Sequence, residues 1–361
     1  MNRSSVFVSV FSVIVLLSIS FPITSYAATG TLPPIKVIKT ITVGSTPYNP
    51  AYSPVTNDIY VGNFGSSSVS VIDALTNKVV STIPAPPPYT MMYDPSNGSI
   101  YALNQNPGII SIIGANNQLD EQLISSVPLS YISYSPANDE IYTESYYDNV
   151  IFTINATTNL PIGEILVQSP GVVSYSPATH DMYVPNQQEN TVTIISPSDQ
   201  IIGTVPVGNF PEKLVFDPAN NEMFVANILG ASVTVLNSHN QVVATIPTAS
   251  RNYELVYSSK NHDMYIDGDQ TNSVTVINSK NQIVTNLIVG GPLEEMAFDS
   301  ANGKMYVASY DTGTVTVISA TNVILHAFSV GVNPFDALYV PSNNDVYITN
   351  EGSGTVSVLS S

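Results

Sequence analysis

One position that recurs at a fixed interval carries the strongest candidates for chemistry in this chain. Counted in steps of 41 residues, this position holds Asn49, Thr90, Tyr131, Val172, Lys213, Glu254, Glu295 and Asp336. Carboxylate oxygens are the ligands that Ca²⁺ prefers in proteins. If the fold brings equivalent positions together around an axis, the three carboxylates converge. We therefore predict that Glu254, Glu295 and Asp336 bind a hard cation such as Ca²⁺; the alternative is an acidic rim solvated by water.

A second recurring position holds two further carboxylates, Glu144 and Asp267, and two tyrosines follow the first of them. Tyrosines that cluster on an exposed rim can stack on sugars or anchor a protein partner. The alternative is ordinary surface tyrosines in a chain that has 21 of them. We predict that a ligand is contacted by Tyr131, Glu144, Tyr146, Tyr147, Lys213 and Asp267.

The composition excludes several other kinds of site. The chain has no cysteine, so it can form neither a disulfide nor a thiolate metal site nor a cysteine-linked haem. Its formal net charge of −18 argues against a nucleic acid partner, because phosphate contacts need clustered Lys and Arg. The four histidines fall in different repeats, and the sequence contains neither of the glycine-rich nucleotide-binding motifs. We assign no catalytic residue from the sequence.

The first 27 residues have the pattern of a secretory signal peptide. Arg3 precedes an apolar run over residues 6–17, and small residues stand at the end of the segment. We predict cleavage after Ala27 and a secreted or cell-surface protein. The alternative is an uncleaved N-terminal anchor, which would then be the attachment to a membrane. In a secreted chain, the Asn-x-Ser/Thr pattern makes two residues candidates for glycosylation, Asn97 and Asn155.

The elements that must position these residues follow from a column of aromatic side chains at the same interval. Every 41 residues the chain has an aromatic residue, namely Tyr60, Tyr101, Tyr142, Tyr183, Phe224, Tyr265, Tyr306 and Tyr347. Eight copies of one unit of this length indicate a repeat architecture. We expect this column to pack between neighbouring units. We expect the asparagine that often follows three residues later to bond backbone groups at a strand end.

Each copy is predicted to form four short strands. In the fifth copy these cover residues 214–216, 222–227, 232–236 and 241–246. Pro218 ends the first strand because it cannot donate to a ladder, and residues 232–236 alternate polar and apolar with a period of two. Such a sheet cannot bury both faces alone, but it can when copies stack around an axis. The sequence therefore predicts an all-β, eight-bladed β-propeller of four-stranded antiparallel blades.

The two ends of the chain are predicted to meet. The eighth copy lacks a fourth strand, whereas residues 36–41 read as a strand without a blade of its own. We expect one propeller domain, residues 28–361, in which the N-terminal strand completes the last blade; a seven-bladed ring is the alternative. The predicted blades span residues 45–85, 86–126, 127–167, 168–208, 209–249, 250–290, 291–331, and 332–361 together with 34–44.

The second strands carry a family resemblance. They include Tyr60-Val61-Gly62-Asn63, Tyr183-Val184-Pro185-Asn186 and Tyr347-Ile348-Thr349-Asn350, and Ser-Pro lies just upstream of the first two. This pattern resembles the YVTN β-propeller family of secreted or cell-surface proteins from bacteria and archaea, some of them associated with surface layers. The resemblance covers nearly all of the mature chain and implies the propeller fold. The resemblance assigns no catalytic residue to this sequence.

Taken together, these features favour a binding scaffold for protein or glycan partners at the cell envelope. The alternative is a metal-dependent hydrolase or lyase, as in lactonase-like and streptogramin-lyase-like propellers, with its site at the channel mouth. A purely architectural envelope component is a third possibility.

Overall fold

The computed structural model describes residues 35–268 and 270–361. Contacts divide the chain into two units, Met1–Pro34 and Ile35–Ser361, and the second contains the described residues. The predicted signal peptide, residues 1–27, lies outside them. Two short 3₁₀ segments, η1 (Phe64–Ser66) and η2 (Glu351–Ser353), accompany the strands. No helix in the described part of the chain is long and apolar enough to cross a membrane.

The strands form eight four-stranded antiparallel sheets, here called blades 1 to 8 in chain order. Blades 1 to 4 contain β2 (Pro47–Ser53), β3 (Asp58–Asn63), β4 (Ser68–Asp73), β5 (Lys78–Pro84), β6 (Thr90–Tyr93), β7 (Ile100–Asn104), β8 (Ile109–Ile113), β9 (Leu119–Ile124), β10 (Ile132–Ser135), β11 (Glu140–Ser145), β12 (Val150–Asn155), β13 (Pro161–Leu166), β14 (Ser174–Tyr175), β15 (Met182–Asn186), β16 (Thr191–Ile195) and β17 (Ile201–Pro206). Blades 5 to 8 contain β18 (Pro211–Asp217), β19 (Glu222–Asn227), β20 (Ser232–Leu236), β21 (Val242–Pro247), β22 (Leu255–Ser258), β23 (Asp263–Gly268), β24 (Ser273–Ile277), β25 (Ile283–Ile288), β26 (Leu293–Phe298), β27 (Met305–Ser309), β28 (Thr314–Ile318), β29 (Ile324–Ser329), β30 (Pro334–Val340), β31 (Asp345–Asn350), β32 (Thr355–Ser360) and β1 (Lys36–Thr42).

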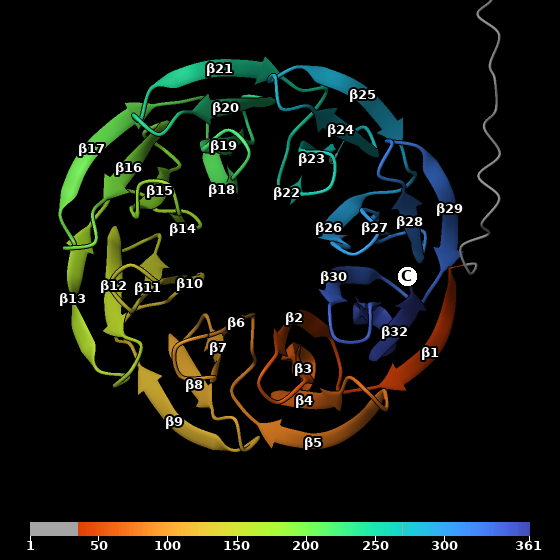
Figure 1. The fold of residues 1–361 in the computed structure, drawn as a ribbon. Coiled ribbons are helices and arrows are strands. Elements are labelled where there is room, and N and C mark those ends of the chain that lie inside the picture. Colours follow the sequence, from red (N-terminus) through yellow and green to blue (C-terminus); the bar gives the residue numbers. More distant parts are fainter. Residues whose placement is uncertain (1–34, 269) are drawn as a thin grey trace, which may run out of the picture. The chain divides into compact units, whose positions relative to one another are not determined.

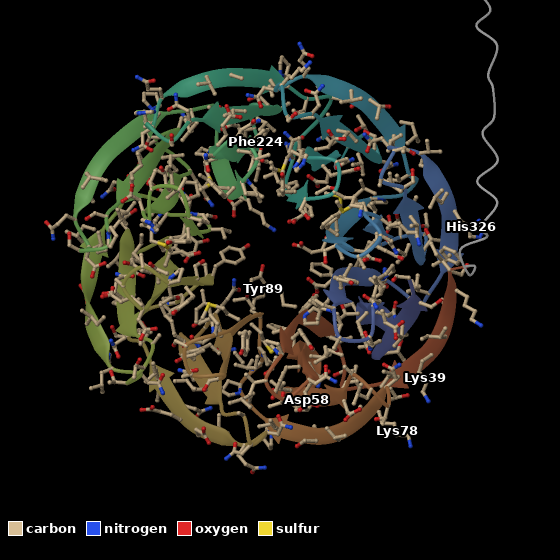
Figure 2. The ribbon with its side chains drawn as sticks, in the orientation of Figure 1. Lys39, Asp58, Lys78, Tyr89, Phe224 and His326 are labelled. Atoms are coloured by element: carbon tan, nitrogen blue, oxygen red, sulfur yellow. The ribbon has the colours of Figure 1, made fainter. Side chains whose placement is uncertain are left out.

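The blades are arranged as a closed ring. The first strand of each blade contacts the first strands of both neighbouring blades, from β2 and β6 round to β30 and β2 (Figure 1). The fourth strands lie at the outer circumference, where Figure 2 shows Lys78 on β5 and His326 on β29. The prediction of an eight-bladed, four-stranded propeller is confirmed, and the seven-bladed alternative is wrong.

The ring closes through the two ends of the described unit. In blade 8 the strand order is β1-β32-β31-β30, so the N-terminal strand supplies the outer strand of the last blade. Figure 1 shows β1 beside β32, and in the register of this pair Thr40 lies opposite Ser357 and Ile41 lies opposite Val356. This pairing covers an edge of β32 that would otherwise expose unpaired backbone groups. The predicted closure is confirmed.

The hydrophobic core lies between adjacent blades. Tyr60 packs with Val69 and Val71 of its own blade and with Ile100 and Ala102 of the next. Complete burial of a side chain of this size contributes about 1.5–3 kcal/mol. The aromatic column therefore packs between units, as expected from its spacing.

Hydroxyl groups of this column add a second contact between several blades, although Tyr306 Oη has no hydrogen-bond partner among the described residues. Tyr183 Oη donates to Asn240 of the next blade over 2.5 Å. Tyr347 Oη makes the same contact with Asn77 over 2.5 Å and so joins blade 8 to blade 1. Both asparagines lie in turns at positive φ, 60° at Asn240 and 53° at Asn77, a conformation that asparagine tolerates well.

The asparagine column fixes the links between blades. Asn63 Oδ1 accepts a hydrogen bond from the backbone N–H of Gly44 over 3.0 Å, as expected. Its Nδ2 also donates to Ser70 Oγ over 2.9 Å, a hydroxyl contact beyond the expected backbone bond. Asn350 repeats the first contact with the N–H of Gly331 over 2.9 Å. These buried amides hold the loops on their side of the ring in a fixed position.

Candidate ligand-binding site

The antiparallel order of the strands places two sets of loops on one side of each blade. These are the links that enter the first strand and the loops between the second and third strands. We call this side the loop face. The turns after the first and third strands lie on the opposite face. The predicted ligand-binding residues Tyr131, Tyr146 and Tyr147 all lie in loops or links of the loop face.

A cavity of about 590 Å³ opens on the loop face over blades 2 to 5. We call it the tyrosine pocket. The aromatic part of its lining is Tyr131, Tyr146, Tyr147 and Phe210, and the side-chain polar part is Gln105, Asn106, Ser130, Gln187 and Glu212. Three of the six predicted ligand-binding residues are therefore brought together here.

The pocket opens where one repeated position changes from large to small side chains. In steps of 41 residues this position holds Tyr48, Tyr89, Ser130, Gly171, Glu212, Tyr253, Glu294 and Phe335. Ser130 and Gly171 are the two small members, and both line the pocket. At Gly171 even a Cβ atom would lie 3.0 Å from the carbonyl oxygen of Glu212. The missing side chains of blades 3 and 4 thus create the space.

The tyrosine rings that frame the pocket are held by contacts with their neighbours. Tyr131 packs against Tyr89 with ring centroids 6.1 Å apart, and Figure 2 places Tyr89 at the rim of the central opening. Tyr146 and Tyr147 meet edge to face at 5.1 Å. Gln188 Nε2 donates to Tyr146 Oη over 2.8 Å. Tyr147 itself remains 82% exposed and is available to a ligand.

A carboxyl–amide pair forms the polar wall of the pocket. Gln187 of blade 4 donates from Nε2 to Glu212 of blade 5. Burial raises the pKa of Glu212 to about 7, although the positive charge of Lys213 opposes this rise. The pair therefore offers hydrogen-bond acceptors and an amide donor at the point where two blades meet.

Glu144 lies behind this wall, on β11 of blade 3. Its side chain is fully buried, and neither carboxyl oxygen has a hydrogen-bond partner among the described residues. Burial raises its pKa well above the usual range, and repulsion from Glu212 adds to the rise. Nearby backbone N–H groups of Glu144 and Tyr131 oppose it without reaching hydrogen-bonding geometry. Burial of this kind favours the protonated form of the carboxyl over the charged form.

The recurring position that holds the predicted metal ligands lies at the channel mouth. There the ammonium group of Lys213 supplies the positive charge next to the carboxylates. Lys213 Nζ forms ion pairs with Glu254 and, at 3.7 Å, with Glu295. Burial alone lowers the pKa of Lys213, but the two carboxylates more than reverse this and raise it. Burial raises the pKa of Glu254, with repulsion from Glu295 as the next cause. The positive charge of Lys213 thus compensates the negative charges of two of the three predicted metal ligands. Lys213 also lines a cavity of about 290 Å³ that shares Tyr131 and Glu212 with the tyrosine pocket.

Asp336, the third predicted metal ligand, is engaged in ring closure. Its Oδ2 accepts hydrogen bonds from the backbone N–H of Asn49 over 2.7 Å and from Thr349 Oγ1 over 3.3 Å. Burial and the repulsion of Glu295 raise its pKa to about 8. Among residues 35–268 and 270–361, no three Asp, Glu or His side chains form a group that could hold a metal ion. The Ca²⁺ site stays a prediction, and it competes with an ammonium already in place.

Asp267 has a backbone contact that explains its position. Its Oδ1 accepts hydrogen bonds from the N–H groups of Tyr253 over 2.7 Å and Glu254 over 2.9 Å. Asp267 occupies the same repeated position as Glu144 and Thr349, and Thr349 Oγ1 likewise accepts from the N–H of Asp336 over 3.0 Å. This position therefore fixes the link that enters the blade. Asp267 also lines a separate cavity of about 300 Å³ with Glu254, Glu294 and Glu295.

Sequence reasoning missed seven of the polar, aromatic or small residues in the pocket, namely Gln105, Asn106, Ser130, Gly171, Gln187, Phe210 and Glu212. For Ser130 and Gly171 a signal was present in the position one residue before the channel-mouth column, where the repeat loses its large side chains. Sequence reasoning also missed a second aromatic cluster on the loop face. There Tyr48 packs against Phe64 at 5.9 Å and Phe335 at 4.8 Å, and Tyr310 donates to Glu351 over 2.6 Å.

The two glycosylation candidates lie on the face opposite the loop face. Asn97 Nδ2, the atom that would carry the sugar, donates to the carbonyl oxygen of Ala156 in the next blade over 2.7 Å. Asn155 Oδ1 accepts hydrogen bonds from the N–H and the hydroxyl of Thr158, both at 2.8 Å. Modification of Asn97 would break a contact between blades, whereas Asn155 Oδ1 is bonded within its own turn.

Comparison with known proteins identifies solved structures that have a similar fold. No protein-family model matches the sequence, and no curated protein shows significant sequence similarity to it. The structure is similar to the C-terminal WD40 domain of Sif2 (TM-score 0.76, 13% identity, 92% of this chain and 99% of that chain covered). It is also similar to Sqt1 of Saccharomyces cerevisiae (TM-score 0.77, 11% identity, 89% of this chain and 98% of that chain covered). A third similar structure is virginiamycin B lyase from Staphylococcus aureus (TM-score 0.61, 10% identity, 91% of this chain and 100% of that chain covered). At these identities the similarity establishes the β-propeller fold.

Proposed function

We propose that this protein is a secreted or cell-surface binding scaffold that recognises a protein or glycan partner through its loop face. The observation that carries the proposal is the tyrosine pocket, which opens where the repeat departs from its own pattern. Residues that escape the packing constraint of a repeated scaffold are free to serve binding. The signal-peptide pattern of residues 1–27 supports a location outside the cytoplasm, and the repeated Tyr-x-x-Asn strands support membership of the YVTN family.

Known propellers show that this fold serves more than one kind of function. Among the similar structures, Sif2 carries a WD40 domain and virginiamycin B lyase is named as an enzyme. The choice therefore rests on the site and not on the fold. Tyr131, Tyr146 and Tyr147 offer rigid amphipathic surface, and aromatic residues of this kind dominate binding hot spots.

Retention on cell-envelope preparations tests this proposal. We expect the protein to remain bound after washing, and we expect the variant Tyr146→Ala/Tyr147→Ala to lose at least ten-fold in retention. Leu75, which is 73% exposed in a turn of the opposite face, provides the control Leu75→Ala, which should be retained like the natural sequence. Absence of retention, or a protein located in the cytoplasm, would contradict the proposal.

The second candidate is a metal-dependent hydrolase or lyase at the channel mouth. The observation in its favour is the convergence of Glu254 and Glu295 on one point, because an added cation could replace Lys213 there. Calorimetric titration with Ca²⁺ on the natural sequence and on Glu295→Gln distinguishes the candidates. Heat that disappears in the variant, together with metal-dependent turnover in a lactone or ester screen, would favour the enzyme. No heat in either protein removes this candidate.

A further inference from the structure

We propose that the tyrosine pocket binds an uncharged oligosaccharide. This rests on the proposed function and names the class of ligand at the same site. A cavity of about 590 Å³ lies within the range of about 300–1,000 Å³ that is usual for small-molecule sites.

The walls of the pocket combine the two surfaces that a sugar requires. A sugar ring presents one face of C–H groups, which packs on an aromatic ring, and an edge of hydroxyl groups, which needs paired donors and acceptors. Tyr131, Tyr146, Tyr147 and Phe210 supply the aromatic rings. Because Tyr146 and Tyr147 stand edge to face, with an interplanar angle of 86°, a flat aromatic ligand could not stack on both rings at once.

The Gln187–Glu212 pair supplies the hydroxyl-binding groups. One N–H of Gln187 is used in the bond to Glu212, so the pair still presents carboxyl and carbonyl oxygens as acceptors and a second N–H as donor. Gln105 and Asn106 add two further amides from blade 2. Amide and carboxyl groups arranged side by side match the alternating donors and acceptors of neighbouring hydroxyls.

Charge selects against acidic ligands. Among the described residues that line the pocket there is no Lys, Arg or His side chain, and Glu212 contributes negative charge when ionised. The ammonium of Lys213 is engaged by Glu254 and Glu295. An acidic sugar or a phosphate group would lose its hydration in the pocket without gaining a counter-charge. We therefore expect neutral hexose or N-acetylhexosamine chains to bind and their sialylated or uronic acid counterparts to be rejected.

The repeat itself provides the sharpest test. Ser130→Tyr gives blade 3 the residue that blades 1, 2 and 6 carry at the same position, as Tyr48, Tyr89 and Tyr253, so the backbone is suited to it. The new side chain fills the pocket without changing the Gln187–Glu212 pair. Leu75→Tyr adds the same side chain to the opposite face and serves as the matched control. Melting temperatures near that of the natural sequence confirm that both variants are folded.

The experiment uses an array of neutral oligosaccharides and their acidic counterparts, followed by calorimetry on the neutral compounds that bind. We expect binding to neutral members, at least ten-fold weaker binding to the acidic counterparts, and at least a ten-fold loss of affinity in Ser130→Tyr with none in Leu75→Tyr. No binding to neutral members, or binding that Ser130→Tyr leaves intact, overturns the inference. If envelope retention persists and is lost in Ser130→Tyr without any oligosaccharide bound, the pocket takes a protein segment and the proposed function stands. If retention is also absent, both fail.

Discussion

At the scale of single residues, the exception in the aromatic column is as informative as the rule. Phe224 occupies the position where seven other blades have tyrosine, and Figure 2 shows it in blade 5. By the spacing of 57 residues seen between Tyr183 and Asn240, its partner is Asn281 in the next blade. Asn281 Oδ1 is buried and has no hydrogen-bond partner among the described residues. The acceptor is present and the donor is missing.

Phe224→Tyr should therefore stabilise the protein. The new hydroxyl satisfies Asn281 Oδ1, and a buried hydrogen bond of this kind contributes about 0.5–1.5 kcal/mol to the free energy of unfolding. Chemical denaturation measures the change. The matched reverse variant is Tyr101→Phe, which removes the 2.5 Å bond to Asn159 together with the contacts of the same hydroxyl to Asn97 and Ala156, and should destabilise by at least this amount. A destabilised Phe224→Tyr would show that blade 6 cannot accept the hydroxyl.

The residues of the candidate site were only partly predictable. Tyr131, Tyr146 and Tyr147 could be selected from the sequence because large aromatic side chains in loops stand out. Ser130 was missed although its repeated position loses the large side chain in the sequence, because a small residue indicates a pocket only once its neighbours from other blades are in place. The expected role of Glu254 as a metal ligand depended on its charge and its place in the repeat, whereas its ion pair depends on Lys213 reaching it across the boundary between two blades.

At the scale of elements, the sequence predicted strands well wherever local chemistry determines their ends. β19 and β20 have the predicted bounds, Glu222–Asn227 and Ser232–Leu236, and β18 ends at Asp217 before a proline. β18 begins earlier than expected, at Pro211, because Pro211 pairs with Asn227 on the neighbouring strand. That pairing depends on tertiary register, which the apolar pattern of residues 214–216 does not contain.

The pairing of β1 with β32 provides a prediction at this scale. Thr40 and Ser357 lie opposite each other, and directly opposed residues of antiparallel strands have Cα atoms close enough for a disulfide. Since the chain has no cysteine, Thr40→Cys/Ser357→Cys introduces a single possible bond. We expect it to form on oxidation and to raise the free energy of unfolding by about 2–4 kcal/mol.

The control for this bond shifts one partner along the same strand. Thr355 lies opposite Thr42, so Thr40→Cys/Thr355→Cys places the thiols out of register. Intact mass and free-thiol titration should show a disulfide in the first variant and free thiols in the second. The reverse result would mean that the strands pair in another register.

At the scale of the whole molecule, the buried carboxyl groups at the channel and the loop face couple stability to pH. Burial raises the pKa of Glu212 to about 7 and that of Asp336 to about 8, whereas both groups titrate near pH 4 when the chain is unfolded. Between these values the folded protein binds more protons than the unfolded chain. Its free energy of unfolding must therefore decrease as the pH rises from about 4 to 8.

Melting temperatures measured across this range test the coupling. We expect a steady decrease from pH 5 to pH 8. Asp336→Asn, which keeps an oxygen acceptor for the N–H of Asn49 but cannot ionise, should show a smaller decrease. A melting temperature that rises with pH in the natural sequence would contradict the raised pKa values of Glu212 and Asp336.

Binding at the loop face can be followed directly because the chain has no tryptophan. Tyr147→Trp places a single fluorophore at the edge of the tyrosine pocket, and Leu75→Trp places one on the opposite face. On titration with neutral oligosaccharides released from cell-envelope preparations, we predict a saturable change in the emission of Tyr147→Trp. We predict no change in Leu75→Trp, and none when Ser130→Tyr is added to Tyr147→Trp. Equal changes at both tryptophans, or a change that survives Ser130→Tyr, would contradict a binding site in this pocket.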